Sequence, residues 1–241
     1  MSPEIAEENP MSAETDEKAA PDTALEVPSV ASGSTVRKPL TARGERTRAS
    51  LVSAARTVFE RDGFADSRLT DITTEAQCSI GSFYTYFDSK EEILDAVLAE
   101  AHQDMLHPGF PHVEPGSEDD PTEILAAANR AYFEAYRRNA GLRLVLEQVS
   151  STMAEFREKR RQRSLVFVER NARHIRELQE RGIADPDLDA VAAAAALSGM
   201  VSRMAYQAFI VGGEPSDVDA MVDTATRLWV NAIGVRRPDR A

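Results

Sequence analysis

The chain has 241 residues, 42% of them hydrophobic, and a formal net charge of −12 at pH 7, which allows one or two globular domains with a sizeable core. The acidic, polar N-terminus is unlike a secretory signal, and no apolar run reaches the roughly 20 residues that a membrane-spanning helix needs. The single cysteine, Cys78, excludes an intramolecular disulfide. Together these features predict a cytoplasmic protein with no membrane partner.

Charge is distributed unevenly along the chain. Residues 1–36 are rich in Glu, Ala, Ser, Pro and Thr and lack apolar periodicity, so we expect a disordered acidic tail there. Residues 37–90 hold nine basic and seven acidic residues, whereas the segments on both sides are acidic. The segment opens with a basic arm made of Arg37, Lys38, Arg43, Arg46 and Arg48. Because salt screens charges beyond about 10 Å, this local surplus can contact phosphate within an acidic chain.

Apolar residues at helical spacing predict three helices in residues 37–90. The first ends at Gly63, and a short second helix follows Thr70 as its N-cap. Residues 77–79 form a tight corner, and a third helix covers about residues 80–87.

The remaining sequence also predicts helices. Ser89 and Glu92 form a capping box before a helix with the apolar face Ile93, Leu94, Val97, Leu98, Ala101 and Met105. Residues 107–120 form a loop, and an acidic cap followed by proline restarts the helix at Asp120. Further helices are expected at about 142–153, 156–181, 185–211 and from 216 onward. With no alternating strand pattern, the fold is expected to be all-α with about nine helices.

Two short helices joined by a tight corner are typical of a helix-turn-helix, whose second helix enters the major groove of DNA. Ile72 and Phe83 can hold the pair together from inside, while Gly81 and Ser82 keep the groove-facing surface slim. The hydroxyl groups of Tyr84, Thr85 and Tyr86 and the ammonium of Lys90 can contact phosphates or bases.

The stretch from Arg48 to Leu94, which includes GFADSRLTDITTEAQCSIGSFYTYFDSKEEIL, resembles the N-terminal domain of the TetR family of bacterial regulators. The resemblance implies that Thr70, Tyr84 and Lys90 contact phosphates. It also implies that bases or sugars are contacted by Ile80, Gly81, Ser82, Thr85 and Tyr86. With Arg46 and Arg48 of the basic arm, these residues form the expected DNA-binding site.

The resemblance further implies a two-fold dimer and a small-molecule effector that enters a C-terminal domain. We therefore expect three regions: the tail (1–36), a helix-turn-helix domain with its basic arm (37–90) and an effector-binding and dimerisation domain (91–241). The expected effector site, suited to a partly apolar ligand, comprises Met105, Tyr132, Tyr136, Leu146, Met153, Phe167, Met200, Arg203 and Met204. The expected dimer surface comprises Ala192, Ala196, Gly199, Leu228 and Trp229.

Several charged side chains have alternative interpretations. Arg203 is the only charge between Asp189 and Glu214, so it needs an acid, a subunit or an anionic ligand as partner. A second basic cluster is read as a solvated helix face and comprises Lys159, Arg160, Arg161 and Arg163. The spacing of His102, His107 and His112 does not put them on one helical face, so no metal site is expected.

The sequence thus predicts a sequence-specific transcriptional regulator, a repressor that binds a palindromic operator as a homodimer and is released by an effector. The alternative is an architectural DNA-binding protein on the same fold without an effector. No nucleophile elbow, phosphate-binding loop or metal motif is present in the sequence, so we expect neither an enzyme nor a cofactor.

Overall fold

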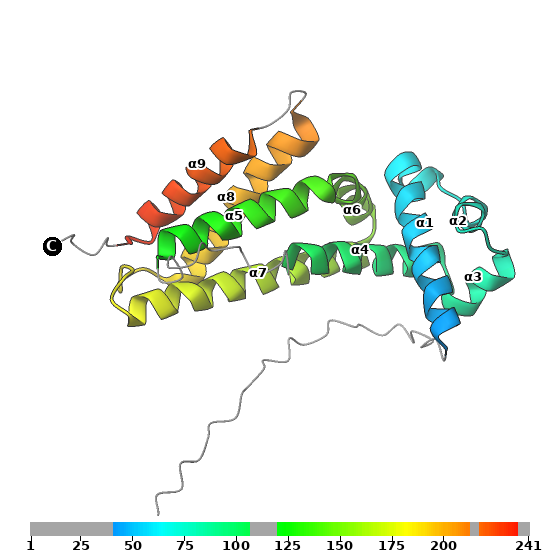
Figure 1. Ribbon diagram of the computed structural model, residues 1–241, viewed down its shortest axis with the longest axis horizontal. Helices are drawn as coiled ribbons and strands as arrows, with labels where there is room; N and C mark the ends of the chain where they lie inside the picture. Colours follow the sequence, from blue (N-terminus) through cyan, green and yellow to red (C-terminus); the bar gives the residue numbers. More distant parts are fainter. Residues whose placement is uncertain (1–40, 107–119, 213–216, 236–241) are drawn as a thin grey trace, which may run out of the picture. The chain divides into compact units, whose positions relative to one another are not determined.

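The computed structural model describes residues 41–106, 120–212 and 217–235 of the chain, and within these ranges it is helical with no strand (Figure 1). The expected tail, Arg37, Lys38, His107 and His112 lie outside the described residues. The helices are α1 (Ala42–Asp66), α2 (Leu69–Glu75), α3 (Ile80–Tyr86), α4 (Lys90–Leu106), α5 (Pro121–Arg138), α6 (Ala140–Thr152), α7 (Ala154–Glu180), α8 (Ala190–Tyr206), a π-helical turn (Gln207–Val211) and α9 (Val218–Ala232). The expected all-α class and helix number are confirmed for this part of the chain.

Side-chain caps explain several of the helix starts. The Asp120 carboxylate accepts a hydrogen bond from the Thr122 backbone N–H at 2.8 Å, with proline in the first turn of α5. Ser89 likewise caps α4 by accepting from the Glu92 N–H at 3.1 Å. Glu92 accepts in return from the N–H of Asp88, one residue before the expected partner.

The start of α8 differs from the expectation. Asp189, and not Asp185, caps this helix, since its carboxylate accepts from the N–H groups of Val191 and Ala192. Asp185 instead accepts from the N–H of Asp187 in the preceding turn. The proline signal at residue 186 therefore marks a turn and not a helix.

The described residues bury two hydrophobic clusters. The first cluster joins α1, α2, α3 and the first part of α4 to α6 and Phe156. The second cluster joins α5, α7, α8 and α9 to Met105 at the end of α4. The apolar face expected for α4 is buried throughout, and the helix contributes side chains to both clusters.

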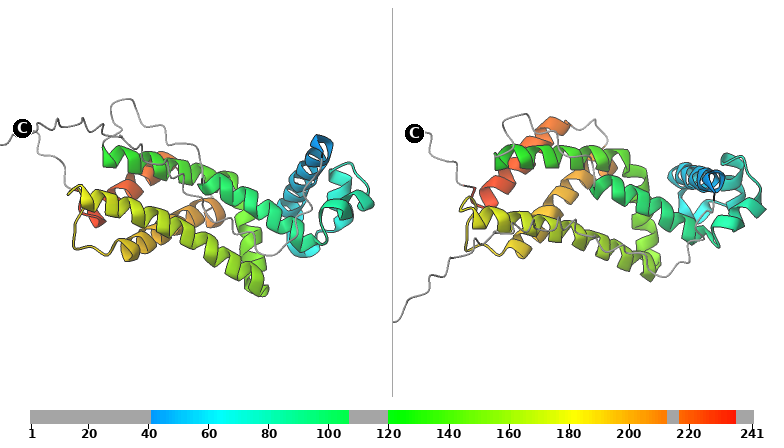
Figure 2. Two further views of the ribbon diagram at one scale, coloured as in Figure 1. Left: turned by 90° about the horizontal axis from the view of Figure 1, so that it is seen from below. Right: turned by 60° about the horizontal axis from the view of Figure 1, so that its bottom comes forward.

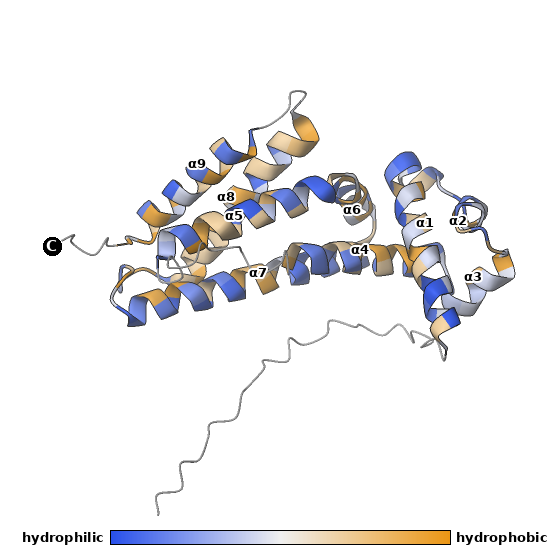
Figure 3. Ribbon diagram, in the orientation of Figure 1, coloured by the Kyte–Doolittle hydropathy of each residue, from blue (hydrophilic) through white to orange (hydrophobic). Residues whose placement is uncertain are grey.

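The larger C-terminal part is built from helices that pack lengthwise. α9 packs along α5, and α8 packs along α7 (Figure 2). The ribbon of α8 is mostly apolar, whereas α7 alternates between charged and apolar residues (Figure 3). No helix among the described residues has the length and apolar character needed to cross a membrane.

Candidate nucleic-acid interface and ligand cavity

The helix-turn-helix is held together from inside. Ile72 on α2 and Phe83 on α3 are both fully buried in the first cluster. Between the helices, Gln77 adopts a positive φ of 52°, which turns the chain sharply, and Cys78 donates its backbone N–H to the Thr73 carbonyl at 2.9 Å. The Cys78 side chain packs against the cluster as a small apolar group, and burial raises the pKa of its thiol.

One face of α3 is exposed beside this corner. Ile80 and Tyr84 are exposed by 43% and 49%, and Gly81 and Thr85 are also exposed. Ser82 and Tyr86 are half-buried, and the Tyr86 ring packs against the first cluster. The expected recognition residues therefore lie on one short helix, with Tyr84 more accessible than Tyr86.

Residues of the expected basic arm from Arg43 onward are part of α1, because Thr41 caps this helix by accepting from the Gly44 N–H at 3.1 Å. Arg46 is exposed. The guanidinium of Arg48 lies 5.1 Å from the centre of the Phe87 ring, and its buried Nε has no hydrogen-bond partner among the described residues. The expected basic arm is thus, from residue 43 onward, part of a helix that presents Arg46 to solvent.

Thr70 and Lys90 have local roles that the sequence did not indicate. The N-cap of α2 is Arg68 and not Thr70, which lies exposed within the helix. The Lys90 ammonium donates to the carbonyls of Phe64 at 2.7 Å and Ser67 at 2.8 Å, and it lies 4.5 Å from the centre of the Phe64 ring. Lys90 therefore joins the start of α4 to the end of α1.

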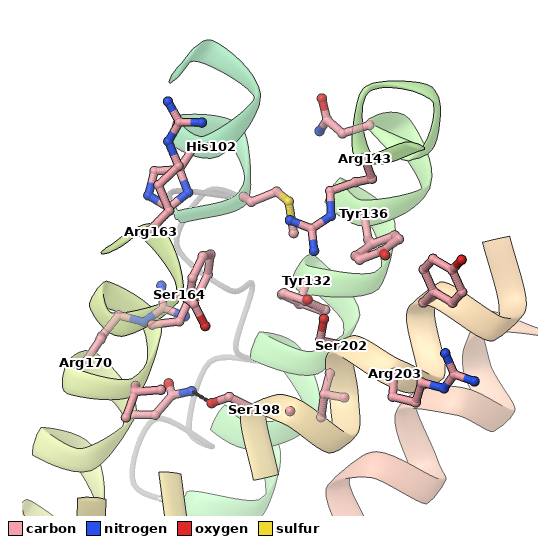
Figure 4. Close-up of a pocket in the computed structure, with 18 of the residues that line it drawn as sticks. His102, Tyr132, Tyr136, Arg143, Arg163, Ser164, Arg170, Ser198, Ser202 and Arg203 are labelled. Carbon is pink, nitrogen blue, oxygen red and sulfur yellow. Dashed lines mark hydrogen bonds between the residues drawn. The ribbon is translucent and has the colours of Figure 1, made fainter. Parts of the chain in front are cut away.

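The C-terminal part encloses a cavity of about 460 Å3. Its described lining residues come from α4, α5, α6, α7 and α8, with Trp229 from α9 (Figure 4). Tyr132 lies in this lining, and burial raises the pKa of its hydroxyl, although Arg143 acts in the opposite direction. A cavity of this size falls within the range of about 300–1,000 Å3 that is usual for small-molecule sites.

Six of the nine expected effector residues line this cavity. They are Met105, Tyr132, Tyr136, Leu146, Phe167 and Arg203. The other three do not: Met153 packs against the first cluster, and Met200 and Met204 pack against the second cluster away from the lining. Helical register explains the two α8 residues, because Val201 and Ser202 occupy the inner positions of that turn.

The sequence left open whether the partner of the lone charge Arg203 is an acid, a subunit or an anionic ligand. Arg203 is exposed, and its guanidinium lies 5.3 Å from the centre of the Tyr206 ring. With the Gln207 side-chain amide turned so that its oxygen faces Arg203, this oxygen accepts hydrogen bonds from the guanidinium. In Figure 4 the Arg203 side chain points away from Tyr132 and Tyr136. Its charge is therefore accommodated at the rim of the cavity, by a ring face and an amide.

Part of the second basic cluster is buried, which corrects the interpretation of a solvated face. The side chains of Lys159 and Arg163 are exposed by only 14% and 16%, and both form ion pairs with Asp95 of α4, at 3.1 and 3.0 Å. Burial lowers the pKa of Arg163, while Asp95 acts to raise it. Arg161 is exposed, as expected, and pairs with Glu158.

Sequence reasoning missed the polar side of the cavity. Arg143, Arg163, Arg170 and His174 line it from α6 and α7. One signal was available, because Arg143 interrupts the apolar run Leu142–Leu146. The Arg143 guanidinium therefore had to lie near the buried face of that helix. The α7 residues carry no such signal, since charged and apolar residues alternate along that helix.

The expected dimer residues divide into two groups. Ala192, Ala196 and Gly199 are exposed along α8, and Leu228 of α9 is exposed by 42%. Trp229 is only 5% exposed and lines the cavity. Trp229 therefore belongs to the interior and not to an outer surface, since its neighbour Leu228 takes the outward position on α9.

A helix-turn-helix followed by a larger helical part with an internal cavity defines the class of helix-turn-helix transcriptional regulators. Two family models match the chain: "Bacterial regulatory proteins, tetR family" over residues 51–97, and "Transcriptional regulator EthR, C-terminal domain" over residues 125–234. The chain belongs to the TetR family of transcriptional regulators. It is accordingly a DNA-binding regulator and not an enzyme.

Individual relatives agree with this family. The nicotine-responsive transcriptional repressor HdnoR of Paenarthrobacter nicotinovorans is 36% identical over 72 residues, which span 30% of this chain and only 37% of that repressor. The transcriptional regulator TtgR of Pseudomonas putida is 25% identical over 197 residues, covering 78% of this chain and 89% of TtgR. The solved structure of SmeT, the repressor of a Stenotrophomonas maltophilia multidrug efflux pump, has a TM-score of 0.63 at 23% identity, over 81% of this chain and 96% of SmeT.

Proposed function

We propose that the protein is a repressor that binds a palindromic operator as a homodimer and releases it when a small molecule occupies the C-terminal cavity. The observation that carries the proposal is a set of shared side chains. Leu98 and Ala101 of α4, with Leu142 and Leu146 of α6, belong to the cluster that holds the helix-turn-helix and also line the cavity. A ligand that changes their packing changes the support of the recognition helix.

The proposed DNA-binding site comprises Arg46, Arg48, Thr70, Ile80, Gly81, Ser82, Tyr84, Thr85 and Tyr86. The exposure of Ile80 and Tyr84 supports it, because large side chains on a short exposed helix are suited to the major groove. A hydroxyl donor and a ring edge on Tyr84 can meet phosphate oxygen and thymine methyl. Lys90 is left out of the proposed site, since two carbonyl oxygens of the chain already accept from its ammonium.

We propose that the effector occupies the cavity and that the operator-binding unit, residues 37–90, is followed by an effector-binding and dimerisation unit, residues 91–241. The relative HdnoR is named as nicotine-responsive, so a ligand response is present among the relatives. An effector lowers operator affinity only through its different affinity for the two states of the repressor.

The proposed dimer surface combines the exposed small residues of α8 with Leu228 of α9. Small side chains allow two helices to approach closely, and the apolar Leu228 adds area that water does not solvate well. A two-fold dimer would present two α3 helices to half-sites about 34–36 Å apart, one turn of DNA.

The first test selects binding sequences from a random duplex library and then measures affinity by fluorescence anisotropy. We expect a palindromic consensus and two chains per duplex. Tyr84→Ala should weaken binding by about 10-fold or more, while the control Leu165→Ala, which removes a similarly exposed side chain on α7, should leave it unchanged.

Two results would contradict the proposal. Equal affinity of the Tyr84→Ala variant and the wild type would refute the site. Many weak, unrelated sequences without any response to ligands would refute the repressor and favour the architectural alternative.

A further inference from the structure

The cavity carries an excess of positive charge. Its described lining includes Arg143, Arg160, Arg163, Arg170 and Arg203, whereas Glu147 is the only carboxylate among them. Arg163 is compensated by Asp95, and Arg160, Arg170 and Arg203 are exposed. Arg143 is half-buried and therefore carries the charge that matters most for a bound molecule.

Arg143 extends from α6 into the cavity. Figure 4 shows its guanidinium beside the rings of Tyr132 and Tyr136, which also line the cavity. The guanidinium carbon lies 5.0 Å from the centre of the Tyr136 ring, and Arg143 has no ion pair among the described residues. A half-buried cation without a carboxylate is unfavourable, and an anion beside it relieves that cost.

Arg170 adds a second positive group on the opposite wall. It donates to the Leu106 carbonyl at 2.9 Å and lies 5.4 Å from the centre of the Phe167 ring. The residue is exposed as a whole, while desolvation lowers the pKa of its guanidinium. Neither the carbonyl nor the ring supplies a full negative charge.

Two further polar atoms in the lining point to a ligand with acceptor oxygens. Trp229 is 5% exposed, and its Nε1–H has no hydrogen-bond partner among the described residues. The Nε2 of His174 is also buried and unpartnered within the described chain. An indole N–H is a donor only, so its natural partner is an oxygen or other acceptor.

We propose that the effector is an amphipathic organic anion, whose acidic group binds Arg143 and whose apolar body lies among the aromatic side chains of the cavity. This inference rests on the proposed effector role of the same cavity. A cationic ligand fits less well, because guanidinium groups of the chain already cover the ring faces of Tyr136 and Phe167. An ammonium would meet like charge there.

The test uses two probes with the same ring system. 1-Anilinonaphthalene-8-sulfonate carries an anionic group, and N-phenyl-1-naphthylamine lacks it. Trp229 is the only tryptophan of the chain and lines the cavity, so energy transfer from Trp229 to each probe reports binding at this place. We expect the wild-type protein to bind the anionic probe about 10- to 100-fold more tightly, the range of one charge-assisted contact.

Substitutions test whether Arg143 is the source of the preference for the anionic probe. Arg143→Met should reduce affinity for the anionic probe by about 10-fold or more and change affinity for the neutral probe by less than about twofold. Arg143→Lys should retain part of the preference. The control Arg173→Met removes an exposed arginine of α7 that does not line the cavity, and should leave both affinities unchanged.

Equal affinities of the wild-type protein for both probes would overturn the inference, even if Arg143→Met failed to fold. Equal loss of both probes in a folded Arg143→Met variant would also overturn it, because shape and not charge would then be responsible. Operator release is measured separately by anisotropy. Tighter binding of the anionic probe without operator release would refute the effector role and leave the charge preference standing. Operator release by the neutral probe alone would refute the charge preference and leave the effector role standing.

Discussion

Lys90 offers a sharp test, because resemblance and structure give it different roles. The resemblance implies a phosphate contact, whereas in the structure the ammonium donates to the carbonyls of Phe64 and Ser67 and lies over the Phe64 ring. Lys90→Met keeps most of the aliphatic stem and removes the charge and all three donors. The change leaves carbonyl oxygens at the end of α1 without their partner.

The expected loss of stability follows from these contacts. A hydrogen bond from a charged donor contributes about 1.5–3 kcal/mol, and a cation near a helix C-terminus about 0.3–1 kcal/mol. Lys90 is half-buried, so water can replace part of what is lost. We therefore expect the free energy of unfolding to fall by about 2 kcal/mol, which for a chain of this size lowers Tm by about 4–8 °C.

Urea unfolding measures the stability, and the salt dependence of operator affinity measures phosphate contacts. Each lost phosphate contact reduces the slope of log affinity against log salt by about 0.9. We expect Lys90→Met to unfold more easily with an unchanged slope. The control Arg46→Met, which alters an exposed residue of α1, should keep its stability and lose about one unit of slope. Unchanged stability of Lys90→Met together with a reduced slope would refute the structural role.

Two other substitutions test separate properties. Gly81→Ala compares the stability of the fold with operator affinity, and Asp104→Asn tests how stability depends on pH. A methyl at Gly81 meets nothing closer than 3.8 Å, so Gly81→Ala should stabilise α3 by about 0.5–1 kcal/mol and yet weaken operator binding in anisotropy; unchanged affinity would show that this face does not approach DNA. Hydrogen bonds from Arg138 hold the pKa of Asp104 below its ordinary value of 3.8, so this carboxylate stabilises the fold above that pH and the contribution disappears as pH falls through the lowered pKa. In urea unfolding, the wild-type protein should be more stable than Asp104→Asn near pH 7, and the two should become similar below about pH 4. A stability difference that stays constant with pH would show that the ionised Asp104 carboxylate is not its cause.

Much of the fold was predictable because its signals are local. The apolar face of α4 recurs every three or four residues, and the caps at Ser89 and Asp120 lie within three residues of the groups they satisfy. The α8 start shows where local signals conflict: Asp185–Pro186 and Asp189 are both suitable N-terminal signals. Asp185 is tied instead to α9, because its N–H donates to the Ile233 carbonyl at 2.9 Å. Sequence spacing carries no information about that contact.

The candidate site was less predictable, because its charges are settled by distant partners. Arg163 and Lys159 look solvated on a charged helix, but they meet Asp95 on α4, more than sixty residues earlier. For Lys90 the resemblance implies a phosphate contact, and the packing adds carbonyl partners at the end of α1 that the sequence does not indicate. Arg203 is the only charge in an apolar run and needs a partner, and the packing places it at the rim beside the Tyr206 ring. A lone sequence gives the type of each charged group, and only the packing of helices decides which of them remain uncompensated.

This packing also explains how one helix can serve both ends of the proposed mechanism. The first cluster is closely packed, with Ile93 and Leu94 of α4 fully buried, and the same helix places Leu98 and Ala101 against the cavity. Close-packed interiors transmit displacement because they contain little free volume. Asp95 fixes the intervening turn of α4 to α7 through Arg163, so α4 is held from the cavity side as well as by Lys90. A ligand that moves α7 relative to α6 therefore acts on α4 through a charged contact and an apolar one, and breaking the charged contact alone, with Asp95→Asn, should weaken the effector response more than operator affinity.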